Sequence, residues 1–128
     1  MRILLDTCTF LWISVDSPKL SKVARSAYLD VANEVFLSVA SAWEINVKNG
    51  IGRLPLPMPA ERFVADVRRR HQIETLPIDE ESVLAIGRLE KLHRDPFDRL
   101  LVSQAIVHGM LLLTPDPLIA QYPARQLW

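Results

Sequence analysis

The chain has 128 residues, of which 49% are hydrophobic and 23% charged, which is ordinary for a globular domain large enough to bury a core. Fifteen basic and fifteen acidic residues cancel, so the net charge gives no global attraction for nucleic acid, and such a partner would need a local basic patch. The single cysteine, Cys8, excludes an internal disulfide framework and a cysteine-based zinc site.

The apolar stretches of the chain are short. None approaches the roughly 18 residues that a membrane span needs. Asp6 interrupts the first apolar stretch almost at once, which is unlike the layout of a secretory signal. No internal repeat or glycine-serine linker divides the chain. We therefore expect one cytoplasmic domain, residues 1–128, with no membrane contact.

The first predicted element is a strand, Ile3–Leu5, whose three branched apolar residues fit a strand buried on both faces of a parallel sheet. It stops at Asp6, and ligands of open α/β sheets bind beyond the carboxyl ends of the strands. Further strands are predicted at 35–37, 73–78 and 110–113, with an edge strand at 125–127. Helices are predicted at 7–14, 21–30, 38–49 or 41–49, 60–71, 80–92 and 96–108. This alternation predicts an α/β fold with a central parallel sheet of four to five strands flanked by helices.

Local signals predict where two of these helices begin and end. Ser38 or Ser41 caps the third helix, and Asn49-Gly50 is a good left-handed stop for it. Asp95-Pro96 opens the last helix, with the aspartate at the cap and the proline in the first turn, and Gly109 lies beyond its end.

Carboxylates lie near the carboxyl ends of the predicted strands or at the start of the last helix, at positions Asp6, Glu44, Asp98 and Asp116. Because the strand ends of one parallel sheet face the same way, these acids should converge at one edge. Clustered carboxylates repel each other, and a hard divalent cation, Mg²⁺ or Mn²⁺, relieves the repulsion. Such a site can orient water and stabilise the charge of a phosphate that undergoes in-line displacement.

Each of these acids also has a structural interpretation. Asp6 could cap the first helix. The stretch from Ser41 to Glu44 matches a capping box, in which the glutamate bonds back to the cap. Asp98 would be favoured by the dipole of its helix, and Asp116, which stands between two prolines, could hold a turn.

Four of the following five stretches contain these acids: Leu4–Thr7, Ser38–Ile45, Lys48–Leu54, His93–Leu101 and Leu113–Asp116. Together these resemble a PIN domain and, more narrowly, the VapC-type toxins of bacterial and archaeal toxin–antitoxin pairs. The resemblance runs from Arg2 to about Tyr122. It implies an endoribonuclease that depends on Mg²⁺ or Mn²⁺ and hydrolyses RNA phosphodiester bonds with a metal-activated water. It also implies a homodimer, a small cognate antitoxin as partner, and strand order 3-2-1-4-5, which makes the first strand central.

By position, the acidic quartet of the family falls on Asp6, Glu44, Asp98 and Asp116, which would be the metal ligands and catalytic residues. The last helix offers two aspartates. Asp98 is favoured as the ligand because it directly precedes the apolar part of the helix, which leaves Asp95 as the cap.

Other side chains are candidates to bond the acids, a metal-held water or a phosphate: Thr7, Thr114, Asp95, Lys48 and His93. The alternative for Lys48 is an i, i+4 ion pair with Glu44, and His93 is favoured as a supporting residue rather than the base. The candidate RNA contacts are Arg53, Arg94 and Arg99. The three tryptophans, Trp12, Trp43 and Trp128, are predicted to pack in the core or in an interface rather than to stack on bases.

The leading hypothesis is therefore a Mg²⁺- or Mn²⁺-dependent ribonuclease that acts as a toxin. One alternative is a catalytically silent PIN-like module that binds RNA or a protein. A receiver-like phosphoacceptor ranks last, because its acceptor aspartate should end a middle strand, whereas the third strand here ends at Leu76-Pro77.

Overall fold

In the computed structural model, which describes residues 1–128, the sheet is built outward from its central strand β1 (Arg2–Leu5). This strand pairs in parallel with β2 (Glu34–Ser38) on one side and with β4 (Leu111–Leu113) on the other. Strands β3 (Glu74–Leu76) and β5 (Gln126–Leu127) complete the edges, again in parallel. The order is β3-β2-β1-β4-β5, which confirms the predicted order 3-2-1-4-5 and the α/β class.

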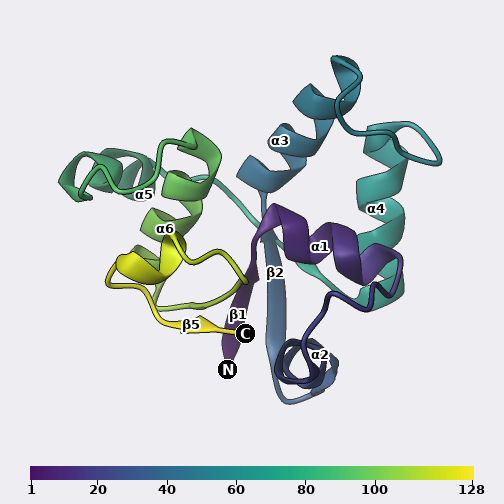
Figure 1. The fold of residues 1–128 in the computed structure, drawn as a ribbon, viewed down its shortest axis with the longest axis horizontal. Helices are drawn as coiled ribbons and strands as arrows, with labels where there is room; N and C mark the ends of the chain where they lie inside the picture. Colours follow the sequence, from purple (N-terminus) through teal and green to yellow (C-terminus); the bar gives the residue numbers. More distant parts are fainter.

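Helices cover both faces of this sheet (Figure 1). They are α1 (Thr7–Ser14), α2 (Lys22–Leu29), α3 (Val39–Gly50), α4 (Ala60–His71), α5 (Glu80–Ala85) and α6 (Pro96–His108), with short 3₁₀ turns η1 (Ile86–Arg88) and η2 (Ile119–Gln121). No helix has both the length and the apolar character that crossing a bilayer would require.

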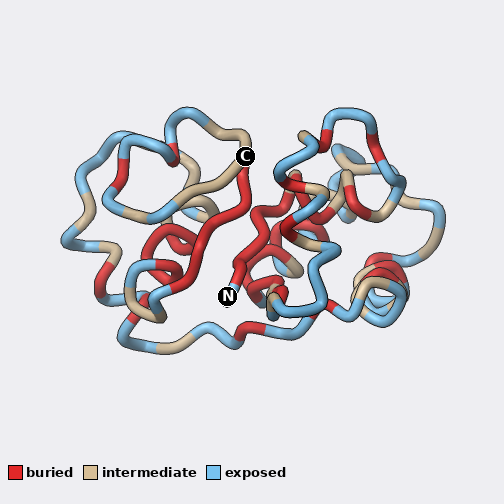
Figure 2. Tube along the Cα trace, turned by 90° about the horizontal axis from the view of Figure 1, so that it is seen from below, coloured by how far each residue is buried: buried red, intermediate tan, exposed pale blue.

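Two apolar clusters form the core, one on each face of β1. Successive side chains of a strand point to opposite faces, so Ile3 and Leu5 pack with α1, α2 and α4, whereas Leu4 packs with α6. Ile3, Leu4 and Leu5 are all fully buried. Figure 2 shows the buried segments in the centre and the exposed ones at the periphery. The uninterrupted apolar run before Asp6 thus reflects burial on both faces, and it places that carboxylate at the centre of the sheet's carboxyl edge.

Helix α3 corrects two predictions. Ser38 is its N-cap, and Ser38 Oγ accepts a hydrogen bond from Ala40 N, so Ser41 and Glu44 do not form a capping box. The helix continues through Gly50, and the left-handed residue is Gly52, with φ +75°. A backbone bond from Arg53 N to Lys48 O, of 2.9 Å, then closes the helix end. The helix thus ends at the predicted Asn49-Gly50, but the left-handed residue lies two positions later than predicted.

The predicted helix 80–92 was also too long, because α5 ends at Ala85 and gives way to η1. Arg99 Nη2 donates to the carbonyls of Ile86 and Leu89, at 3.3 and 3.5 Å, so these groups bond to α6 instead of to a continuing helix. The predicted strand 73–78 is shortened to three residues, since Pro77 has no amide to continue the ladder.

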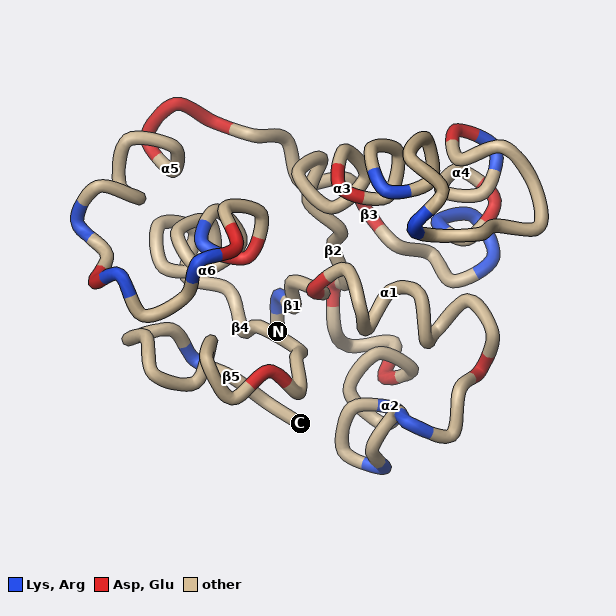
Figure 3. Tube along the Cα trace, turned by 45° about the horizontal axis from the view of Figure 1, so that its top comes forward, with Lys and Arg blue, Asp and Glu red and all other residues tan.

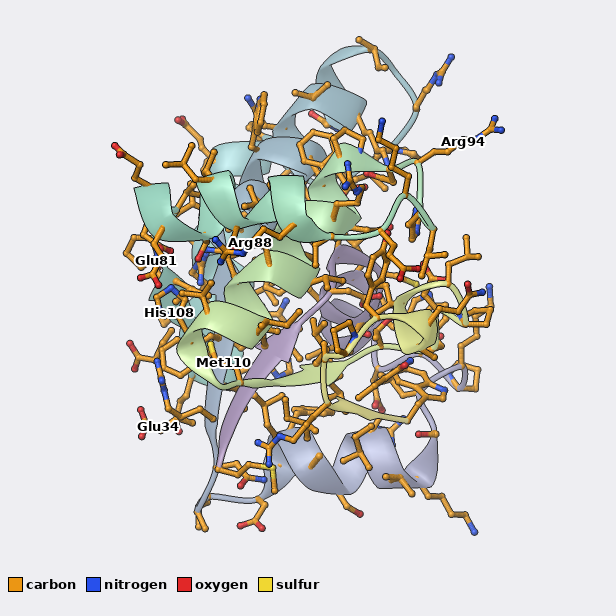
Figure 4. All side chains as sticks on the ribbon, turned by 90° about the vertical axis from the view of Figure 1, so that its left-hand side faces the viewer. Glu34, Glu81, Arg88, Arg94, His108 and Met110 are labelled. Atoms are coloured by element: carbon orange, nitrogen blue, oxygen red, sulfur yellow. The ribbon has the colours of Figure 1, made fainter.

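The far end of α6 has its own polar contact. His108 Nε2 lies 2.8 Å from Asp79 Oδ1, and this contact lowers the pKa of Asp79 to about 2. Asp79 also caps α5 by accepting from Ser82 N. Figure 4 shows His108 at the left edge of the view, far from Arg94, which extends into solvent at the other end. His108 therefore ties α6 to α5 away from the acids.

Candidate metal centre

The predicted acids gather at the carboxyl edge of the sheet. Asp6 follows β1, Glu44 lies in α3 directly after β2, Asp98 is in the first turn of α6, and Asp116 follows β4. The first two are buried, with 5% exposure each, whereas the side chains of Asp98 and Asp116 are 19% and 26% exposed. The site thus has a buried floor and a rim that solvent and ligands can reach.

Asp6 forms the centre of the floor. Its Oδ1 accepts from Thr9 N at 2.8 Å, so it caps α1, and its Oδ2 accepts from Thr114 Oγ1 at 2.5 Å. The cap interpretation is therefore confirmed, and it is compatible with a place in the acid cluster. The hydroxyl of Thr114 also accepts from Asp116 N at 3.1 Å, which links two of the acids through one side chain.

Glu44 is held from two sides. Thr7 Oγ1 donates to its Oε1 at 2.6 Å, and Lys48 forms an ion pair with its Oε2. The i, i+4 ion pair that was the alternative for Lys48 is confirmed. The pair also raises the pKa of Lys48, mainly through the hydrogen bond to Glu44.

The two aspartates at the start of α6 have different surroundings. Asp95 Oδ1 accepts from Phe97 N at 2.9 Å and from Asp98 N at 3.4 Å, which confirms Asp95 as the helix cap. Asp98 Oδ2 instead lies 3.0 Å from His93 Nε2. The same imidazole nitrogen lies 2.9 Å from Asp116 Oδ2. Asp98, rather than Asp95, is thus the aspartate of this helix that joins the cluster.

His93 lies between two acids, a central position that the sequence did not reveal. Its Nδ1 accepts from Asp95 N at 3.1 Å, so in the neutral ring the proton sits on Nε2, where it can be shared by Asp98 and Asp116. Its backbone amide donates to Tyr122 Oη, and that hydroxyl donates to Glu90 O, both at 2.9 Å. Tyr122 therefore fixes the loop that carries His93, and no pattern in the sequence indicated this.

The pKa values of two acids in the cluster, Asp6 and Asp98, are raised, in both cases mainly by burial. Burial raises the pKa of Asp6, against hydrogen bonds from Thr114 and Thr9 that lower it. Burial, followed by the negative charges of Asp95 and Glu44, raises the pKa of Asp98 to about 7. A divalent cation would relieve both effects, since it favours the charged form of a carboxylate.

The donor set also fits such an ion. Ligand atoms of His93, Asp98 and Asp116 all lie within 4.8 Å of one another. Carboxylate oxygens dominate the cluster and a single imidazole accompanies them, a set that suits Mg²⁺ or Mn²⁺ better than the sulfur- and nitrogen-rich sets of zinc sites.

The predicted RNA contacts are placed unequally. Arg94 is exposed beside the rim (Figure 4), and Arg53 is exposed beyond the end of α3. The guanidinium of Arg99 instead donates hydrogen bonds to the carbonyls of Ile86 and Leu89, so it bonds within the fold. Figure 3 shows basic and acidic segments mixed around the whole trace, in agreement with the neutral composition.

The tryptophans follow the prediction only in part. Trp12 and Trp128 pack together, with ring centroids 5.7 Å apart, as predicted. Trp43 is 57% exposed and meets Phe97 edge to face, at 5.0 Å between centroids, so it does not pack in the core, and the alternative of an interface stays a prediction for this residue.

Replacing Thr114 with valine should raise the pKa of Asp6 further, because the hydroxyl hydrogen bond favours the charged carboxylate. Carbon NMR of the labelled Asp6 carboxyl, titrated in the metal-free protein, would measure this. Replacing Thr75 with valine is the matched control, since Thr75 lies in β3 at the edge of the sheet. An Asp6 titration identical in the wild type and in Thr114→Val would refute the role of the hydroxyl.

Comparison with known proteins gives a consistent picture. The family model of the PIN domain matches residues 3–124. Ribonuclease VapC16 of Mycobacterium tuberculosis is 42% identical over 55 residues, which is 43% of this chain and only 39% of that relative. The structure of VapBC2 from Rickettsia felis bound to a DNA fragment from their promoter aligns with TM-score 0.75 at 16% identity, covering 99% of this chain and 98% of that one. DNA-bound VapBC from Salmonella typhimurium aligns with TM-score 0.70 at 17% identity, with coverage of 99% and 97%.

Proposed function

The chain belongs to the PIN domain family, and on that basis we propose that it is a Mg²⁺- or Mn²⁺-dependent endoribonuclease that acts as the toxin of a toxin–antitoxin pair. The observation that carries the proposal is the acid cluster itself, in which burial and the negative charges of Asp95 and Glu44 raise the pKa of Asp98 to about 7. A cluster of this kind costs folding free energy unless a cation is bound, so it is expected where a cation is used.

In this proposal Asp6, Glu44, Asp98 and Asp116 hold the ion. When bound, Mg²⁺ or Mn²⁺ supplies an activated water and stabilises the charge that develops on the phosphate and on the leaving 3′ oxygen. The threonines orient the ligands, since Thr7 and Thr114 each donate to one carboxylate oxygen of the floor. His93 holds a proton at Nε2 between Asp98 and Asp116, which keeps these two carboxylates close before the ion binds.

A small antitoxin as partner and a homodimeric state follow from the resemblance to VapC-type toxins, and the name VapBC of the solved complexes supports the partner. Helix α3 offers an apolar surface for such contacts. Val39, Trp43 and Val47 recur at i, i+4 and i+8, and all three are exposed. This stripe supports a protein interface at α3.

The activity is tested by incubating the purified chain with single-stranded RNA and Mn²⁺ and analysing the ends of the fragments. Hydrolysis with a leaving 3′ oxygen should give 5′-phosphate and 3′-hydroxyl ends. If the folded protein binds the RNA but leaves it intact, that result would favour the catalytically silent binding module instead. Growth arrest on expression, relieved by a partner encoded beside the gene, would test the toxin role separately.

A further inference from the structure

A pocket of about 280 Å³ lies beside the acid cluster and shares two residues with it, Thr7 and Glu44. One wall is the first turns of α1, and the other is the end of α3 with the segment that follows it. The lining consists of Thr7, Cys8, Leu11, Trp12, Glu44, Lys48, Arg53 and Leu54. Its volume is at the lower end for small-ligand pockets, about 300 Å³, which suits one nucleotide rather than a stacked run.

The far wall of the pocket carries two cationic residues, Lys48 in α3 and Arg53 in the segment that follows it. Arg53 N donates to Lys48 O at 2.9 Å, and Asn49 Nδ2 donates to Leu54 O at 2.8 Å, so the segment after Gly52 is folded back onto α3. The charge of Lys48 is partly offset by its ion pair with Glu44. The Arg53 side chain forms no ion pair or hydrogen bond within the chain, so its guanidinium is available to an anion.

The other walls are apolar. Leu11, Trp12 and Leu54 line them, and the Trp12 ring is already packed by Lys19 and Trp128. A ligand that matches this lining combines an apolar part with an anionic group at the Lys48 and Arg53 end. A nucleotide has that composition, and its phosphate would neutralise the cations that face it.

From these features we infer that the pocket binds the nucleotide next to the phosphate that is cut. Arg53 is the main contact to the phosphate of that bound nucleotide. The inference rests on the proposed ribonuclease function. It further states that the RNA strand runs along the side of the acid cluster formed by α1 and the end of α3. Arg53 is then a positioning residue, since it holds the strand without touching the reacting phosphate. The opposite rim, near Arg94, would not be required for this contact.

The test is binding of a fluorescein-labelled single-stranded RNA of mixed sequence in Ca²⁺, measured by anisotropy over a range of salt concentrations. Arg53→Ala should weaken binding by about five- to tenfold and reduce the slope of log K against log salt by about 0.7, the value for one phosphate contact on a single strand. Arg53→Lys should restore most of the slope, because it keeps the charge. Lys22→Ala, which removes one charge from α2 at the opposite end of the sheet, should change neither quantity.

A second readout uses Cys8, the single cysteine, which lines the pocket and is partly exposed. The RNA should protect it from a methanethiosulfonate reagent in the wild type and less so in Arg53→Ala. The inference would be overturned if the wild type and Arg53→Ala had equal salt slopes and the RNA did not protect Cys8. RNA binding by the wild type would, in that case, leave the proposed function standing. A wild-type chain that neither binds nor cuts RNA would overturn both.

Discussion

Asp6→Asn and Asp116→Asn should each reduce RNA cleavage by at least about a thousandfold, or about 4 kcal/mol in activation free energy. Asparagine keeps the shape of the side chain but removes the charge that would hold a divalent ion. The fold should survive, because asparagine caps a helix as well as aspartate does and can still accept from Thr9 N. Initial rates on single-stranded RNA in Mn²⁺, with circular dichroism of each variant, provide the measurement.

The matched control for these variants is Asp30→Asn, the same substitution at the exposed end of α2, remote from the acids. It should cleave at the wild-type rate. Full activity in a folded Asp6→Asn or Asp116→Asn protein would remove both residues from the proposed machinery.

Asp98→Asn should make the metal-free protein more stable above pH 7. The folded-state pKa of Asp98 is about 7, against 3.8 for an ordinary aspartate, because burial and the charges of Asp95 and Glu44 disfavour ionisation. The free energy of unfolding therefore falls as pH rises from about 4 to about 7 and stays low above that. Three pKa units correspond to on the order of 3 to 4 kcal/mol, which asparagine would recover.

Urea unfolding in the presence of a chelator, at pH 3.5 and at pH 8, checks this prediction. The variant should match the wild type at the lower pH, where Asp98 is protonated in both the folded and the unfolded states, and should exceed it at the higher pH. Mn²⁺ should then stabilise the wild type more than the variant. A variant that is less stable than the wild type at pH 8 without metal would contradict the destabilisation that burial and neighbouring negative charges are expected to cause at Asp98.

Much of the fold was predictable because buried segments are recognisable in the sequence as runs of apolar residues. The Ile3–Leu5 run has no polar residue, since β1 is buried on both faces, and this predicted a strand inside a parallel sheet. Asp95 before Pro96 correctly identified the start of α6. The strand order came from the family resemblance, and the structure bears it out.

The features that escaped prediction depend on contacts between distant residues. The end of α5 is set by the guanidinium of Arg99, which lies in another helix. The position of His93 depends on Tyr122, 29 residues further along the chain, and periodicity carries no information about such a pair. The roles of Asp95 and Asp98, by contrast, were predicted, and the side-chain contacts agree: Asp95 caps α6 and Asp98 lies beside His93.

The most direct measurement follows Mn²⁺ occupancy and RNA cleavage on the same wild-type protein. Calorimetric titration gives the fraction of sites filled at each Mn²⁺ concentration, and initial rates on single-stranded RNA give the activity. Cleavage should be absent in chelator and should rise in parallel with occupancy. Undiminished cleavage in chelator, or Mn²⁺ binding that persists in Asp6→Asn with wild-type affinity, would contradict a metal-dependent ribonuclease built on these four acids.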